Sequence, residues 1–201
     1  KAITLDSLIG DTLEYAKGYL RLSECLIAEY IGIEDLYTAK EYLTKAACLQ
    51  DIINSNVEFY VNIKHLTYGA LANVYIGIAN LTNNNIYADS CYYFIKKTLD
   101  YFIKQGLTDN AINNGYTYVK YLKYYKKYDE ALAFLQRQEK YFDENSSLLS
   151  LRDYYNDIKE IYILLGDYKN AYECFEKEIE YENVHLNDSS MTALAEMKTE
   201  Q

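Results

Sequence analysis

The sequence predicts an all-α protein built from antiparallel helix pairs. The 201 residues contain no proline, and the eight glycines are dispersed along the chain. Apolar residues recur every three or four positions, as at Tyr155, Ile158, Tyr162 and Leu165, so that they share one face of a helix. A proline-free chain with this periodicity is typical of helices joined by short turns.

Periodicity and turn residues place the helices in order along the chain. Asp11 and Glu14 have the spacing of a capping box near the start of the first helix, and Ser150 with Asp153 have it inside the seventh. We therefore leave open a start of the seventh helix later than residue 148. The expected helices cover residues 11–31, 36–53, 57–81, 86–105, 109–126, 129–142, 148–165 and 168–184, with a further helix beginning near 188.

The clearest pair of helices surrounds a Gly-Asp-Tyr turn at residues 166–168. The turn ends one apolar stripe, and a second stripe follows it at Ala171, Phe175 and Ile179. Two amphipathic helices on either side of a tight turn predict an antiparallel hairpin.

The segment LLGDYKNAYECFEKEIE, residues 164–180, resembles the tetratricopeptide repeat. The family pattern of Tyr, Gly-Asp-Tyr, Ala and Phe is matched by Tyr162, Gly166, Asp167, Tyr168, Ala171 and Phe175. In that pattern the glycine permits the turn, the tyrosine packs across it, the alanine lets the helices approach, and the phenylalanine fills the space beyond. Glu178 departs from the pattern, because the family has a small residue there.

Further copies of the pattern cover most of the chain. KKYDEALAFL supplies Ala131 and Leu135, IEDLYTAKEYLTKA supplies Ala39 and Leu43, and a looser copy contains Ala88. They recur at a longer spacing than the family's usual period of about 34 residues. The resemblance implies a right-handed superhelix of antiparallel helix pairs, an α–α solenoid of about four hairpins, over residues 1–187. Residues 188–201 are expected to start an exit helix.

The resemblance also implies a concave groove, lined mainly by the first helix of each pair. The groove positions carried over from the family are Arg21, Glu24, Asn73, Asn113, Tyr116, Lys120, Lys123, Tyr124, Asn156 and Glu160. Lysine beside asparagine and tyrosine suits the amides and carboxylate of an extended peptide. We therefore expect a peptide or protein segment as the partner.

The lysine-rich strip YVKYLKYYKKYDEALAFL, residues 118–135, raises the alternative of nucleic-acid binding. Four lysines at 120, 123, 126 and 127 form its basic cluster, but the chain has 30 acidic and 20 basic residues and a net charge of −10. This charge repels a phosphate backbone, so we expect no direct nucleic-acid binding. Each lysine taken singly is also consistent with a merely solvated helix face.

Enzymatic residues are not identifiable from the sequence. Cys25, Cys48, Cys91 and Cys174 match neither a zinc site nor a disulfide scaffold, and buried apolar packing is the expected role. His65 and His185 lie far apart, without a neighbouring nucleophile. We expect no enzyme, no cofactor and no metal site, although the many carboxylates leave room for a site that the fold assembles.

The last residues, SSMTALAEMKTEQ, resemble a junction in membrane-bound bacterial regulators, between a periplasmic tetratricopeptide sensor and a coiled coil. This implies the sensor part of a signalling or transcriptional regulator, with a homodimer through the exit helix. The expected location is the periplasmic side of an inner-membrane protein, reached by segments outside this chain, because no apolar run here is long enough to cross a bilayer. The alternative is a free-standing cytoplasmic adaptor with the same groove.

Overall fold

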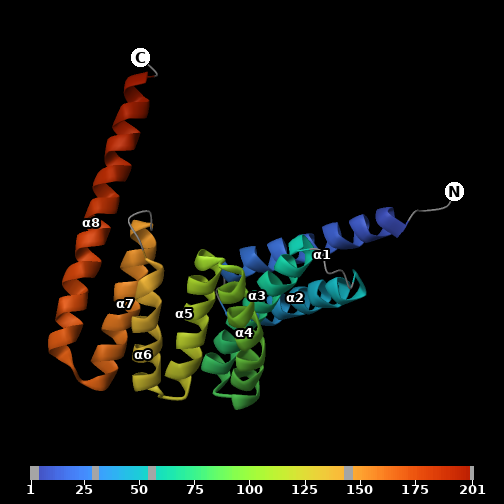
Figure 1. Cartoon of the computed structure of the whole chain (residues 1–201), viewed down its shortest axis with the longest axis horizontal. Coiled ribbons are helices and arrows are strands. Elements are labelled where there is room, and N and C mark those ends of the chain that lie inside the picture. Colours follow the sequence, from blue (N-terminus) through green and yellow to red (C-terminus); the bar gives the residue numbers. More distant parts are fainter. Residues whose placement is uncertain (1–4, 29–31, 54–57, 143–146, 200–201) are drawn as a thin grey trace. The chain divides into compact units, whose positions relative to one another are not determined.

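The computed structural model is all-α within the residues that it describes, which are 5–28, 32–53, 58–142 and 147–199. Side chains are described for 12–26, 32–51, 61–142 and 147–186. The predicted all-α class, with helices packed in adjacent pairs, is confirmed. The elements are α1 (Leu5–Ala28), α2 (Ile33–Ile53), α3 (Glu58–Thr82), α4 (Asn85–Gln105), α5 (Thr108–Tyr124), α6 (Tyr128–Gln138), the 3-10 helix η1 (Glu139–Tyr141), α7 (Leu148–Leu165) and α8 (Tyr168–Thr199) (Figure 1).

The structure departs from the expected helix bounds at the first and last helices, and it confirms the expected start of the seventh. Helix α1 begins at Leu5, so Asp11 lies inside it and does not cap it. Helix α7 begins at Leu148, because the side chain of Ser147 accepts a hydrogen bond from the backbone N–H of Ser150 and caps the helix. No new helix begins near 188, since α8 continues to Thr199 without a glycine or proline to end it.

The described helices group into two compact units, residues 1–124 and 125–201. In the first unit α1 packs against α2 and α3 against α4, while α3 also contacts both α1 and α5. In the second unit α7 packs against α6 and α8, and α8 runs back along α7 and extends beyond the start of that helix (Figure 1). The third expected hairpin has one helix in each unit, so its pairing stays a prediction, as does the division at residue 187.

The core of the first unit depends on alanines where helices meet. Ala39 in α2 and Ala88 in α4 are completely buried, and Leu43 is completely buried one turn after Ala39. Small side chains at such contacts let two helix backbones approach closely.

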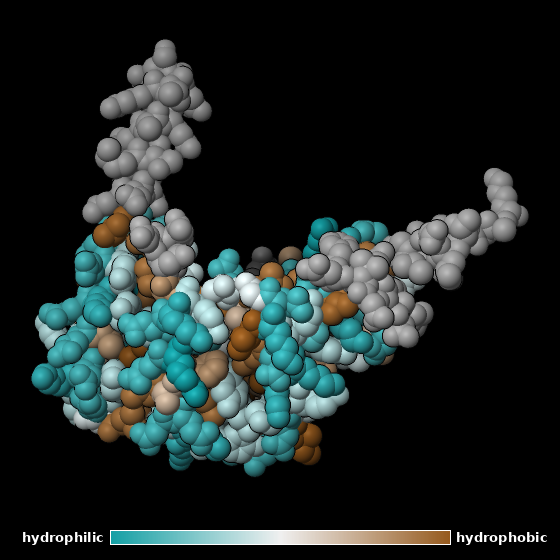
Figure 2. Space-filling model, viewed as in Figure 1, coloured by the Kyte–Doolittle hydropathy of each residue, from teal (hydrophilic) through white to brown (hydrophobic). Residues whose placement is uncertain are grey.

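Hydrophilic side chains cover most of the surface visible in Figure 2, and small groups of hydrophobic side chains lie between them.

The second unit contains the predicted Gly-Asp-Tyr turn. Gly166 ends α7 at a φ of 78°, and its N–H donates to Ile163 O. This left-handed conformation favours glycine. The N–H of Asp167 donates to Tyr162 O, and Asp167 Oδ1 accepts from Asn170 N at the start of α8. The turn is thus the end cap of one helix joined to the start cap of the next.

The alanines of the tetratricopeptide pattern are buried as expected, but two of its aromatic residues are exposed. Ala131 is 0% exposed and Ala171 is 5% exposed, as expected. Tyr168 and Phe175 were expected to pack across and beyond the turn, but they are 71% and 44% exposed. In a repeat array these positions are covered by a following helix, and no further helix follows α8 in the described part of the chain.

The expected burial of the cysteines is correct for Cys91 alone. Cys91 is completely buried, and burial raises the pKa of its thiol to about 12 although Lys120 lies nearby. Cys25 and Cys48 are exposed on the α1 and α2 hairpin, and Cys174 is half-buried. All four are free thiols. A cysteine in the sequence does not by itself show whether its side chain lies on the buried or the exposed face of its helix.

Candidate functional site

The five predicted groove residues of α5 lie on one side of that helix. Its buried residues include Ala111, Ile112, Gly115, Val119 and Leu122. The helical period turns the predicted residues away from this apolar side. Asn113 and Lys120 are exposed, and the remaining three, Tyr116, Lys123 and Tyr124, are half-buried.

A hydrogen bond joins this side of α5 to α3. The ammonium group of Lys120 donates to Oδ1 of Asn73 over 3.3 Å. The hydroxyl of Tyr124 also donates to Oδ1 of Asn85, at the start of α4, over 2.8 Å. We call the set Asn73, Asn113, Tyr116, Lys120, Lys123 and Tyr124 the α3–α5 strip.

The close approach of α3 and α5 requires a glycine. A β-carbon at Gly69 would lie 2.2 Å from Oδ1 of Asn114. Asn114 is itself buried, and its Nδ2 donates to Asn110 O over 2.7 Å. Sequence reasoning missed this pair, although a glycine inside a helical pattern is a recognised signal of close packing.

Gly69→Leu is therefore expected to lower the free energy of unfolding by about 1–3 kcal/mol, because the new side chain overpacks the contact with Asn114. Chemical denaturation followed by circular dichroism measures the change. Gly18→Leu in α1 is the matched control, since a β-carbon there would meet no heavy atom within 4 Å. Equal stability of the Gly69 and Gly18 variants would contradict the packing of α3 on α5.

Arg21 and Glu24 lie exposed on α1, which contacts α3 in the same unit. Nearby, Lys17 donates to the carboxylate of Glu14 over 2.7 Å. This bond holds the pKa of Glu14 below its usual value, and the positive charge of Arg21 contributes less. Arg21 thus adds positive charge to this side of α1.

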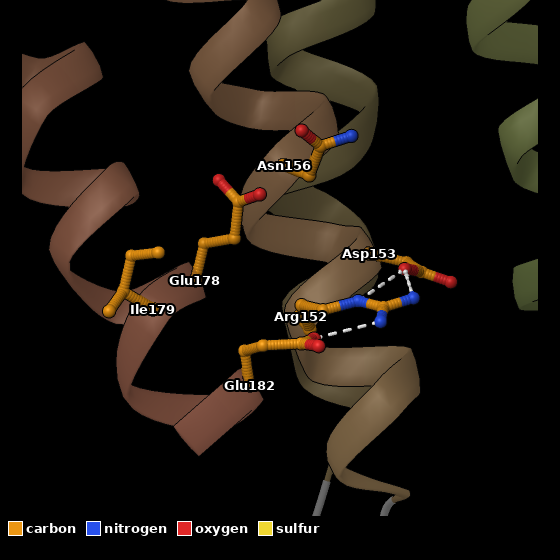
Figure 3. Close-up of a pocket in the computed structure, with 6 residues that line it drawn as sticks. All are labelled: Arg152, Asp153, Asn156, Glu178, Ile179 and Glu182. Carbon is orange, nitrogen blue, oxygen red and sulfur yellow. Dashed lines mark hydrogen bonds and ion pairs between the residues drawn. The ribbon is translucent and has the colours of Figure 1, made fainter. Parts of the chain in front are cut away.

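The other two predicted residues, Asn156 and Glu160, belong to α7 in the second unit. Asn156 lines a polar cleft of about 320 Å³ between α7 and α8, shown in Figure 3. Glu160 is half-buried on the same helix. The other residues that line the cleft are Arg152, Asp153, Glu178, Ile179 and Glu182.

An arginine fork organises one end of this cleft. Nη1 of Arg152 donates to Glu182 over 2.8 Å, and Nη2 donates to Asp153 over 2.7 Å. The Glu182 bond is the main cause that raises the pKa of Arg152 above its usual value. These bonds hold the guanidinium between Asp153 and Glu182, while Asn156 lies farther along α7 (Figure 3).

Glu178, the departure from the tetratricopeptide pattern, forms an ion pair with Lys159 of α7. The pair occupies the place where the family has a small residue, so here two charged side chains hold α8 to α7. Sequence reasoning missed Arg152 and Lys159. The sequence pattern that could have predicted these ion pairs is two basic residues seven positions apart on α7, followed by Glu178 and Glu182 four positions apart on α8.

A second cleft, of about 380 Å³, lies between α1 and α2 in the first unit. Its walls are mostly apolar and include Tyr15 and Tyr19. The Tyr19 ring stacks on Tyr42 with centroids 5.8 Å apart. No predicted residue lines this cleft.

His65 is packed against aromatic rings of α4 and is not available as a proton donor at neutral pH. His65 stacks on Tyr101 with ring centroids 3.8 Å apart. Burial, with the charges of Lys64 and Lys97, lowers the pKa of His65 to about 4, so it is neutral at neutral pH. Within the described ranges, no cluster of three histidine, cysteine or acidic side chains could hold a metal ion.

The comparisons with known proteins give a distant structural similarity. No family model matches the sequence, and no curated protein matches it. The crystal structure of the de novo designed helical repeat protein DHR64 is similar at a TM-score of 0.41 and 15% identity, over 87% of this chain and 96% of that chain. Across the described residues, no helix combines the length and the apolar character that a membrane span needs.

Proposed function

We propose that this chain is a peptide-binding or protein-binding module whose ligand contacts the α3–α5 strip. The observation that carries the proposal is the hydrogen bond between Lys120 and Asn73, which joins the open sides of two neighbouring helices. A lysine that lies only on a solvated helix face would need no hydrogen-bond partner on another helix. The contact makes one polar surface from two helices.

The chemistry of the strip fits an extended peptide with a carboxylate. The Lys120 ammonium group has three donors, of which one bonds Asn73 and two can bond a carboxylate, and the exposed amide of Asn113 can both donate to and accept from a peptide backbone. Extended peptides present such groups at regular intervals. Binding that extends to Arg21 and Glu24 of the same unit is the wider form of the proposal, with a longer ligand. Asn156 and Glu160 belong to the second unit, and their binding role stays a separate prediction.

Lys120→Glu with Lys123→Glu is expected to abolish binding of acidic peptides with a free C-terminus, because both charges then repel the carboxylate. The probes are fluorescein-labelled octapeptides, acidic or neutral, with a free or amidated C-terminus, measured by fluorescence anisotropy. We expect the acidic peptide with a free C-terminus to bind most tightly to the wild-type chain.

The matched control is Lys96→Glu with Lys104→Glu, which makes the same charge change on exposed residues of α4. It should retain binding, and circular dichroism should show unchanged helicity in both double variants. Wild-type affinity in the Lys120 and Lys123 variant would place the site elsewhere.

The more specific proposal is the sensor part of a bacterial signalling or transcriptional regulator, periplasmic and dimeric through residues 188–201. The resemblance of SSMTALAEMKTEQ to a regulator junction supports it; the side chains there lie outside the described ones. The alternative is a free-standing cytoplasmic adaptor. Fractionation of cells that express the full-length gene distinguishes the two proposals. Protein in the membrane fraction that a protease can cleave from the periplasmic side supports the sensor, and protein in the cytosolic fraction supports the adaptor.

A further inference from the structure

The last helix carries an exposed apolar stripe that the α3–α5 strip does not involve. Tyr168, Tyr172, Phe175 and Ile179 are spaced by four, three and four residues, so they share one face of α8. Their exposed fractions are 71%, 61%, 44% and 42%. Ala171 is 5% exposed, which places it on a different, covered face. We call the four exposed residues the α8 stripe.

The edge of the stripe that borders α7 is electrically neutral. Lys159 forms an ion pair with Glu178, and its Nζ lies 5.5 Å from the centre of the Phe175 ring. Farther along, Arg152 forms an ion pair with Glu182. Each acidic side chain on this edge therefore has a cation of the same hairpin beside it.

The opposite edge carries more acidic than basic side chains: three exposed glutamates lie there, with the exposed Lys169 and Lys177 as neighbours on the same helix. Glu173, Glu176 and Glu180 are exposed, and their spacing of three and four places them together on one side of α8. Tyr172 donates a hydrogen bond to Glu176. Among the side chains described in residues 147–186, no lysine or arginine forms an ion pair with these three carboxylates.

The spacing and the charges together select the occupant of the stripe. Apolar residues at intervals of four, three and four match the seam between two packed helices. Two copies of this chain packed antiparallel through the stripe would bring their acidic edges together, which is unfavourable, and two copies packed parallel would leave each acidic edge against a neutral one, without a compensating cation. A helix with an apolar face and lysine or arginine along one edge would instead neutralise Glu173, Glu176 and Glu180.

We propose that the α8 stripe is a docking surface for a basic amphipathic helix of a partner protein. The partner's apolar face covers the four stripe residues, and its basic edge lies against the three glutamates. The surface lies in the second unit, so the proposal is independent of the function proposed for the α3–α5 strip.

The test uses three synthetic helical peptides of about 21 residues, or about six turns. One has leucines at a and d positions with lysines along one edge, the second replaces these lysines with glutamates, and the third scrambles the first. Isothermal titration calorimetry with the whole chain is expected to show binding of the first peptide alone. Equal binding of the scrambled peptide would overturn the proposal, because net charge would then explain the affinity.

Two sets of variants locate the contact. Phe175→Ser with Ile179→Ser should weaken binding of the lysine peptide by about tenfold or more, because both side chains leave the seam. Ile86→Ser is the matched control: this α4 residue is 72% exposed in the other unit, and its loss should change nothing. Wild-type affinity in the stripe variant would refute the docking surface.

Charge reversal tests the acidic edge. Glu173→Lys, Glu176→Lys and Glu180→Lys in one chain should reverse the preference, so that the glutamate peptide binds and the lysine peptide does not. Unchanged preference would contradict the proposal. Sedimentation of the chain alone tests whether a second copy of the chain covers the stripe. A concentration-dependent dimer that Phe175→Ser with Ile179→Ser abolishes would assign the stripe to a second copy and overturn the proposal of a partner helix.

Discussion

Phe102→Ala is expected to lower the free energy of unfolding of the first unit by about 3–5 kcal/mol. Phe102 in α4 is completely buried, and its ring lies 5.5 Å from the Tyr101 ring and 6.2 Å from the His65 ring, between centroids. Removing the ring leaves a cavity among aromatic side chains that stack and cannot easily collapse. Urea denaturation followed by circular dichroism measures the loss.

The adjacent residue supplies the control for this cavity. Ile103 is 49% exposed on the same helix, so Ile103→Ala should cost far less, about 1 kcal/mol or below. Hydrogen exchange should show the larger loss of protection in α3 and α4 of the Phe102 variant. If the two variants unfold at the same urea concentration, Phe102 does not lie in the core.

Ile161→Ala has the largest expected effect in the second unit, about 2–5 kcal/mol. Ile161 in α7 is completely buried, on the same side of the helix as the buried Tyr154 and Ile158. Faster hydrogen exchange in α7 and α8 measures the loss. Ile163→Ala, at a residue 47% exposed two positions later, is the control and should leave protection nearly unchanged. Wild-type protection in the Ile161 variant would refute the packing of α7.

Helix positions were predictable because their causes are local. The start of α7 at Leu148, the end at Leu165 and the turn at Gly166 follow from apolar spacing and from a residue that adopts a left-handed conformation. The same holds for the buried alanines, since a small residue at a fixed distance from a turn marks the contact between paired helices. These signals lie within a few residues of the features they predict.

The candidate site was predictable as a helix face but not as a set of contacts. The period of α5 places Asn113 and Lys120 on one side, yet the bond from Lys120 to Asn73 joins residues 47 positions apart. The approach of Gly69 to Asn114 depends likewise on which helices are neighbours. Whether Phe175 is covered depends likewise on which helix packs on α8. A local pattern carries none of this information.

The turn between α7 and α8 affects how quickly this hairpin forms. Gly166, Asp167 and Asn170 satisfy the end of one helix and the start of the next through bonds that span five residues or fewer. The ion pair of Lys159 with Glu178 closes a loop of modest length around that turn. Chains dominated by contacts between residues close in sequence fold in microseconds to milliseconds, because little loop entropy is lost before contacts form. The hairpin can therefore act as an early structured segment, formed before the slower search for more distant neighbours is complete.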